Sequence, residues 1–149
     1  MPVRAGRLLA IAVRTERNGP MKILDFASVA TGGGVQGDLP ANPDRGVTIL
    51  AQEHWDEVNR ALRVSLPWHT RRANLLVQGL SMSALLGRHI RVGNVKLAIT
   101  AETKPCGLMD TLHPGLRGVL KPDCRGGVHG RVLEGGRISI GDLVAVLPV

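Results

Sequence analysis

The sequence predicts a mainly β fold, a small β-barrel accompanied by a few short helices. Short aliphatic segments alternate with tight glycine turns, and the core must be built almost wholly from Val, Leu and Ile because the chain has one Phe, two Trp and no Tyr. Such short strands and turns are typical of closed or nearly closed barrels rather than of repeated strand–helix–strand units. At 149 residues, 44% hydrophobic and 21% charged, the chain is expected to form one domain over residues 1–149.

The first half of the chain alternates strands with one long loop and one helix. The strands predicted there are residues 3–13, 21–29, 47–50 and 74–77. Residues 31–44 are rich in Gly, Pro, Asn and Asp and predict a long loop. Apolar residues recur at helical spacing over residues 52–63, which predicts an amphipathic helix. A short Ser-capped helical turn is expected over residues 81–86, ended by Gly87.

The second half gives the clearest β signal. Residues 90–92 and 95–100 alternate in and out around the two-residue turn Gly93-Asn94, which predicts a hairpin. Three further strands separated by glycine turns are predicted as a terminal meander over residues 128–133, 137–140 and 143–147.

The charge of the chain limits its possible binding partners, and its cysteine content limits its possible cellular compartment. The net charge is +7, and most of the cations are arginines, whose planar guanidinium suits phosphate and carboxylate. Charge alone is compatible with nucleic acid, with a small phosphorylated ligand or with a merely soluble surface. Two cysteines are too few for a disulfide framework, and no apolar run approaches the length of a membrane span. We therefore expect free thiols and a cytoplasmic protein.

Neither of two familiar motifs predicts a function here. Gly32-x-Gly34-x-x-Gly37 has the spacing of a dinucleotide-binding turn, but Pro40 and Pro43 exclude the helix that this motif requires. The sequence has no Gly-x-Ser-x-Gly element, so it does not predict a serine hydrolase of the nucleophile-elbow type.

Cysteine and histidine residues leave two further alternatives. Cys106, His113, Cys124 and His129 could supply zinc ligands, but the first pair lacks the close spacing of structural zinc sites, so zinc is not predicted. A cysteine–histidine pair formed by Cys106 with either histidine stays open, although no cysteine-protease signature surrounds Cys106.

Cys106 is the residue on which a chemical function would depend. It lies in the segment Thr103-Lys104-Pro105-Cys106-Gly107, directly after a predicted strand, where a thiol is reachable. Lys104 and free backbone N–H groups at the bend would favour the thiolate needed for nucleophilic attack or for binding a soft metal. The alternative is a buried cysteine that acts as a small hydrophobe, which is the expectation for Cys124.

Arginine and asparagine side chains could hold an anionic ligand beside this thiol. Arg71, Arg72 and Asn74 precede a predicted strand and would present guanidinium and amide groups to a phosphate or a polar heterocycle. Taken singly, the arginines could equally be surface charges.

Taken in order, these motifs resemble the MOSC domain family, named for the C-terminal domain of molybdenum cofactor sulfurase. The matching residues are Gly37-Asp38, Val47-Thr48-Ile49-Leu50 with Glu53, Arg72-x-Asn74-Leu75, Gly79, Leu85-x-Gly87, Val92-Gly93, Pro105-Cys106 and Gly135-x-x-Ile138-x-x-Gly141-Asp142. Each turn motif is unspecific alone, whereas their order, their spacing and the single Pro-Cys after a strand are fairly specific.

The resemblance implies a MOSC β-barrel in which Cys106 is the family's signature cysteine. That cysteine relays sulfur in cofactor sulfurases and ligates molybdenum in the similar amidoxime-reducing proteins. Arg72 and Asn74 match the family's Arg-x-Asn element, which lies against the phosphorylated pterin. We therefore expect a molybdenum cofactor (molybdopterin) held by Arg71, Arg72, Asn74 and Lys104, with Gly37 and Asp38 lining the same cleft and Cys106 as the metal ligand.

The resemblance also implies partners and two roles. The 149 residues contain no pyridoxal-phosphate desulfurase domain, no companion domain of the reductase type and no iron–sulfur ferredoxin module. A separate sulfur donor or electron-transfer protein is therefore expected. The domain would serve either a molybdenum-dependent reductase of small N-hydroxylated substrates or the transfer of sulfur or cofactor to other enzymes.

Two competing hypotheses belong to other classes. In a basic nucleic-acid-binding barrel the arginines would follow phosphates, but the chain offers few aromatic side chains for base stacking. In a protein-docking barrel Cys106 would be buried and without a chemical role.

Overall fold

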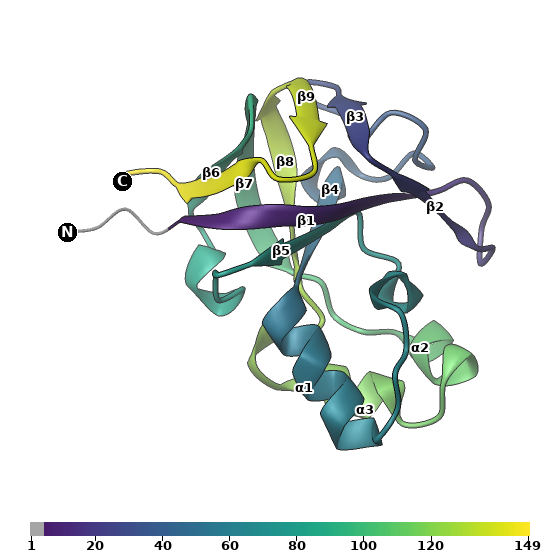
Figure 1. Cartoon of the computed structure of the whole chain (residues 1–149). Helices are drawn as coiled ribbons and strands as arrows, with labels where there is room; N and C mark the ends of the chain where they lie inside the picture. The colour runs from purple at the N-terminus through teal and green to yellow at the C-terminus, as the bar shows by residue number, and fades with distance from the viewer. Residues whose placement is uncertain (1–4) are drawn as a thin grey trace.

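The computed structural model describes residues 5–149, and their backbone confirms the predicted barrel (Figure 1). Seven strands follow one another around it in the order β10, β6, β7, β8, β4, β5, β1, and pairing of β1 with β10 closes the circle. Their bounds are β1 (Ala5–Arg14), β4 (Val47–Ala51), β5 (Leu75–Gln78), β6 (His89–Val92), β7 (Val95–Glu102), β8 (Val128–Glu134) and β10 (Leu143–Val146). Closure leaves these strands without a free edge.

One connection in the barrel is parallel. Strands β4 and β5 pair in parallel, whereas the other neighbours are antiparallel. The parallel pair is joined through α1 (Gln52–Leu62), because a parallel connection needs a crossover segment. The apolar face of this helix buries Trp55 and Val58 against the barrel, and the helix ends at Arg63, which has left-handed backbone angles.

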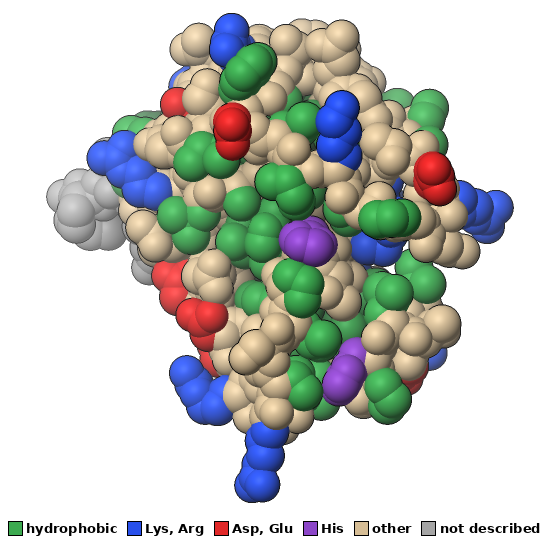
Figure 2. Space-filling view, turned by 45° about the vertical axis from the view of Figure 1, so that its right-hand side comes forward, with side chains coloured by type: hydrophobic (Ala, Val, Ile, Leu, Met, Phe, Trp, Pro, Cys, Tyr) green, Lys and Arg blue, Asp and Glu red, His purple; other side chains and the backbone are tan. Residues whose placement is uncertain are grey.

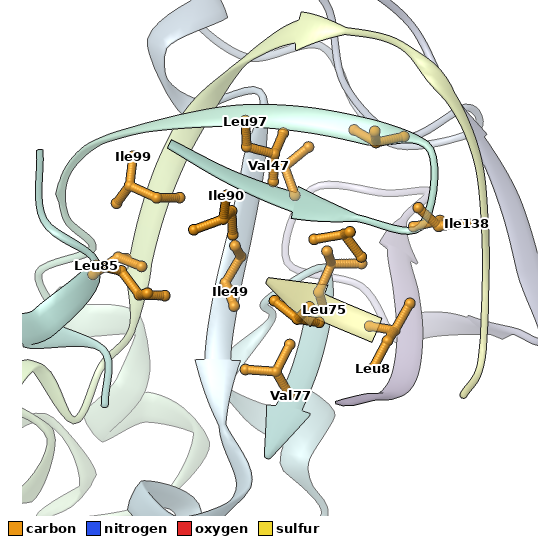
Figure 3. Close-up of a cluster of buried hydrophobic side chains, with 14 of the residues drawn as sticks. Leu8, Val47, Ile49, Leu75, Val77, Leu85, Ile90, Leu97, Ile99 and Ile138 are labelled. Carbon is orange, nitrogen blue, oxygen red and sulfur yellow. The ribbon is translucent and has the colours of Figure 1, made fainter. Parts of the chain in front are cut away.

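Aliphatic side chains fill the barrel interior. Figure 3 shows them converging from strands on opposite walls, with Ile49, Leu75, Ile90 and Leu97 among those labelled. Along β4 all five residues are buried, because one face points into the barrel and the other toward the helices. The expected aliphatic core is therefore confirmed.

A second apolar cluster lies between the barrel and the helices, which gather at the lower end of the molecule in Figure 1. The helices are α1, α2 (Gly107–Leu112) and α3 (Leu116–Leu120). The cluster joins Leu50 of β4 and Trp55 of α1 to Met109 of α2 and Leu120 of α3. Burial of these side chains fixes the segment that follows β7 against the barrel.

Two strand predictions are wrong, the first in the continuity of a strand and the second in the pairing of strands. Residues 21–29 form two strands, β2 (Met21–Leu24) and β3 (Phe26–Val29), separated at Asp25. β2 pairs with β1 as an extension of the large sheet, while β3 pairs with β9 (Gly136–Ser139) in a separate two-stranded sheet. The predicted terminal meander is therefore absent, because β9 leaves the barrel wall between β8 and β10.

Helical segments also differ from the predictions. The turn expected over residues 81–86 is the 3₁₀ helix η3 (Ser83–Leu85), which follows Met82 and has no side-chain cap, so the predicted serine cap is wrong. The helices α2 and α3 were not predicted because six and five residues are too short to show a helical period.

The long loop over residues 31–44 needs its glycines for close backbone approach. A Cβ atom on Gly34 would lie 2.5 Å from the carbonyl oxygen of Gly46, and Gly37 has a φ of +91°. The loop is followed by the 3₁₀ helix η1 (Pro43–Arg45), which leads into β4. A close backbone approach at Gly34 and positive φ angles at Gly32 and Gly37 account for this glycine-rich segment.

Candidate functional site

A cavity of about 190 Å³ opens between the barrel and the segment around α2. Its lining includes the Cys106 thiol and five cationic residues that come from widely separated parts of the chain, and we call it the Cys106 cavity. The cations are Arg14 of β1, Arg45 of η1, Arg71 of the 3₁₀ helix η2 (Trp68–Arg71), Arg72 and Lys104. None of the described residues that line the cavity is acidic. The cavity is therefore suited to an anion.

The backbone after β7 presents Cys106 to this cavity. β7 ends at Glu102, and the next residues are anchored by burial of Thr103 and Pro105 and by a hydrogen bond from the Thr103 N–H to the Gly127 carbonyl (2.9 Å). Cys106 lies directly before α2, its side chain is exposed, and it forms no disulfide. A fixed backbone thus carries a reachable thiol.

Arg71 lies at the buried side of the cavity, with only 7% of its surface exposed. Its Nε donates to the Gly126 carbonyl (2.9 Å), one Nη donates to the Thr103 carbonyl (2.8 Å), and the other contacts the Met109 sulfur (3.7 Å). Glycine is required at position 126, since a Cβ there would lie 2.8 Å from the Thr103 carbonyl oxygen and 3.2 Å from the Arg71 guanidinium. The fold therefore holds the Arg71 guanidinium in a fixed position.

Burial changes the proton affinity of Arg71. Desolvation lowers the pKa of Arg71 from its ordinary value to about 10, Cys106 partly opposes that shift, and the positive charge of Arg45 adds to it. The guanidinium is still protonated at neutral pH. A positive charge therefore stays inside the cavity wall, where the surrounding protein screens it less than water would.

Arg72 and Arg14 also line the cavity, and different contacts hold the two side chains in place. Arg72 donates hydrogen bonds to the carbonyls of Gly19 and Glu16 in the loop between β1 and β2. Arg14 forms an ion pair with Asp38, whose carboxylate is nearly buried and accepts bonds from Nε (3.2 Å), Nη2 (2.8 Å) and the Arg14 backbone N–H (2.7 Å). Desolvation lowers the pKa of Arg72, the charge of Arg14 lowers it further, and Asp38 opposes these effects.

Asn74 is enclosed in the protein and is not among the residues that line the cavity. Its Oδ1 accepts bonds from the N–H (3.0 Å) and hydroxyl (3.1 Å) of Thr48, and its Nδ2 donates to the Ala12 carbonyl (3.2 Å). These contacts join the start of β5 to β4 and β1. Since Asn74 follows Arg72 by two residues, this junction also fixes the backbone that carries Arg72.

The structure brings together only part of the site expected from the sequence. Cys106, Arg71, Arg72 and Lys104 line one cavity, with Lys104 exposed. Asn74 lies in the protein interior, and the Gly37-Asp38 loop lies outside the cavity lining, where Asp38 reaches it only through its ion pair with Arg14.

Arg14 and Arg45 are cavity residues that the sequence did not single out. Arg14 ends a strand and Arg45 ends a loop, and arginines at such places are most often surface charges. The sequence indicated them only through its high overall content of arginine, which is scattered along the chain and forms no run of basic residues. Only the barrel closure shows that these arginines converge.

The remaining cysteine and histidine candidates lie apart from the cavity lining. Cys124 is buried, and desolvation, Glu102 and Asp123 all raise the pKa of its thiol. The His129 ring is also buried, and its Nδ1 lies 3.0 Å from the Thr103 hydroxyl. Within residues 5–149, no group of three or more His, Cys, Asp or Glu side chains is placed to hold a metal ion together.

In the part of the chain that the structure describes, no helix is both long enough and apolar enough to cross a bilayer.

Solved structures with the same fold are known. The chain is similar to the YuaD protein of Bacillus subtilis, with a TM-score of 0.83, 17% identity and coverage of 97% of each chain. It is also similar to YiiM of Geobacillus stearothermophilus (TM-score 0.78, 17% identity, 96% of this chain and 75% of that one). YiiM of Escherichia coli gives a TM-score of 0.74 at 18% identity, covering 96% of this chain and 70% of that one. Among curated proteins, none matches the chain.

Comparison with a family model identifies the protein family of this chain. The model of the MOSC domain matches residues 36–145, a stretch that runs from the glycine-rich loop through β10 and includes Cys106, Arg71 and Arg72. This stretch is well over half of the chain, and the barrel topology and the solved structures agree with it. The chain belongs to the MOSC domain family.

Proposed function

We propose that this MOSC domain acts in molybdenum-cofactor or sulfur-transfer chemistry through Cys106, either as a ligand to molybdenum or as a carrier of sulfur. The observation that carries the proposal is the convergence of one exposed thiol and five cationic side chains on a single cavity. A thiolate suits soft metals and sulfane sulfur, while arginines suit phosphates and other oxyanions. The membership of the family supports this combination.

The donor set fits a molybdenum cofactor in chemistry and only partly in size. The cations match an anionic group, and Cys106 offers one sulfur ligand. The cavity of about 190 Å³ is smaller than the ~300–1,000 Å³ typical of ligand pockets. It would therefore enclose one end of the cofactor and leave the rest at its mouth.

Each residue would then have a distinct task. Arg71 would bind an oxyanion from the buried side, with its geometry fixed by the Gly126 and Thr103 carbonyls. Arg72 would approach from the opposite segment, and Lys104 would attract the anion from the rim. A bound cofactor would supply two-electron chemistry at molybdenum, such as the reduction of N-hydroxylated compounds. Asn74 would act as a positioning residue, since it holds the strand junction behind Arg72.

As a carrier, Cys106 would take a sulfane sulfur from a donor persulfide. The Cys106 thiolate attacks the terminal sulfur, a new S–S bond forms on Cys106, and the donor S–S bond breaks. The donor leaves as a thiolate and takes up the proton that Cys106 released. Cations around the thiol would stabilise both the attacking and the departing anion.

The proposal is tested on the whole chain in two ways. Protein produced in a molybdenum-replete host is assayed for molybdenum and pterin, and the reduced protein is treated with cysteine persulfide and mapped by mass spectrometry. We expect molybdenum retention or a persulfide on Cys106, each abolished in Cys106→Ser and preserved in Cys124→Ser. If wild-type protein shows neither molybdenum nor a persulfide, the proposed function is wrong.

The structure gives less support to a nucleic-acid-binding barrel. Trp55 is buried in the core, so it cannot stack on a base. Figure 2 shows Lys and Arg side chains mostly toward the edges of one face whose middle is apolar, rather than as a continuous stripe. A nucleic-acid groove would show binding that weakens steeply with salt and does not change in Cys106→Ser.

A further inference from the structure

Arg71 is a buried cation for which the described residues 5–149 provide no carboxylate partner. Its hydrogen bonds go to two backbone carbonyls and one thioether sulfur, and none of the ion pairs within residues 5–149 includes Arg71. A charge buried in this way is costly unless a counter-charge joins it. A ligand with negative charge would complete the pairing.

The free donors of Arg71 match an oxyanion. Guanidinium has five N–H donors, and three contacts are used, by Gly126, Thr103 and Met109. One N–H on each terminal nitrogen is therefore left for a ligand in the cavity. Two such donors are suited to two oxygens of one anion.

The cavity is large enough to enclose a small oxyanion. An engineered protein cavity of ~150 Å³ is large enough for benzene, which has six heavy atoms. The Cys106 cavity, at about 190 Å³, therefore accommodates a tetrahedral anion of similar size beside the thiol. A protein loop would not fit in it.

We propose that the Cys106 cavity accepts sulfur directly from a small anionic sulfane-sulfur donor of the thiosulfate class, so that the protein has a sulfurtransferase activity of its own. This inference rests on the proposed function, because it uses Cys106 as a sulfur carrier, and it adds the chemical class of the donor. It requires no donor protein.

The reaction balances without an external oxidant or reductant. Cys106 loses its proton to solvent, and the thiolate attacks the outer sulfur of thiosulfate. The new S–S bond forms on Cys106, the S–S bond of thiosulfate breaks, and sulfite leaves with the bonding pair. Attack of one anion on another is opposed by repulsion in water, and the cations Arg71, Arg45 and Lys104 offset that repulsion in the cavity.

The experiment follows persulfide formation on reduced, full-length protein treated with thiosulfate, and then transfer of that sulfur to cyanide as thiocyanate. We expect Cys106 to gain one sulfur atom and Cys106→Ser to gain none. Arg71→Met should load at least tenfold more slowly, and Arg91→Met, which removes an exposed arginine on β6, should load at the wild-type rate. Loading of the wild type should also slow as salt is added.

Parallel loading with cysteine persulfide separates this inference from the proposed function. Loading by cysteine persulfide but not by thiosulfate would overturn the inference and leave sulfur carrying intact. Loading by neither would overturn the inference and the sulfur-carrying form of the proposed function, and leave only its molybdenum-ligand form. Since Arg71→Met could fail to fold, Lys104→Glu at the exposed rim serves as a second variant. A wild-type rate in Lys104→Glu, together with no effect of salt, would also overturn the inference.

Discussion

Replacement of Asn74 by alanine tests whether this side chain supports the strand junction or binds a ligand. Asn74 is fully buried, and its amide bonds to the Thr48 N–H, the Thr48 hydroxyl and the Ala12 carbonyl. Alanine leaves the buried Thr48 N–H without its acceptor, which costs ~2 kcal/mol, and loses two further hydrogen bonds worth ~0.5 kcal/mol or more each. We therefore expect the free energy of unfolding to fall by about 3 kcal/mol.

Thermal and chemical denaturation of the purified variant measure this effect. For a domain of this length, a loss of about 3 kcal/mol lowers Tm by roughly 6 to 12 °C. The matched control is Asn94→Ala in the exposed turn between β6 and β7, which should change stability by less than about 0.5 kcal/mol. If Asn74→Ala kept wild-type stability and lost only molybdenum or persulfide binding, the structural role assigned to Asn74 would be refuted.

Three further predictions concern the thiol, an ion pair and a buried histidine. With each rate divided by the rate of the same reagent with free cysteine, anionic iodoacetate should alkylate Cys106 faster than neutral iodoacetamide does. Equal relative rates would show that the cavity does not attract anions. Cys124, which is buried, should react only after unfolding. Asp38→Asn should lower the free energy of unfolding by about 2 kcal/mol, and a double-mutant cycle with Arg14→Met should show coupling; additive effects would contradict the ion pair. Desolvation and the charge of Arg45 lower the pKa of His129, and Asp44 opposes them. As the pH drops below 6.5, the imidazole is therefore protonated in the unfolded chain before it is protonated in the folded protein, and the free energy of unfolding should fall. In urea titrations at several pH values, His129→Asn should reduce this dependence of stability on pH, and an unchanged dependence would contradict the prediction.

Local patterns predicted most of the strands, but they could not predict which strands pair. The hairpin of β6 and β7 was found because its two strands meet through a two-residue turn. Residues 21–29 looked like one strand, since nothing in the alternation marks Asp25 as the point where the chain changes sheet. The pairing of β3 with β9 joins segments more than a hundred residues apart. Such pairings depend on the closed barrel, and a local pattern contains no information about it.

The candidate site was predictable to a similar extent. A proline-cysteine step after a strand identified Cys106, and Arg71 and Arg72 came from the same kind of local reasoning. The sequence could not show that Arg71 is buried and lines the cavity, whereas the Asn74 amide is hydrogen-bonded within the strand junction. It also gave no sign of Arg14 and Arg45, because the end of β1 and η1 lie far apart in the sequence and come together only in the closed barrel.

The pairing of β1 with β10 has a consequence for the order of events during synthesis. Ala5 lies opposite Ala145, so the barrel cannot close until nearly the whole described chain has left the ribosome. At ~5–20 residues per second, β1 waits several seconds or more before β10 is available to pair with its free edge. A circular permutant that joins residues 5 and 149 and opens the chain in the exposed β6–β7 turn would place β10 and β1 together early. The delay then passes to the β6–β7 pairing, because β7 emerges first and β6 last, and a permutant stalled before β6 has emerged should remain sensitive to protease.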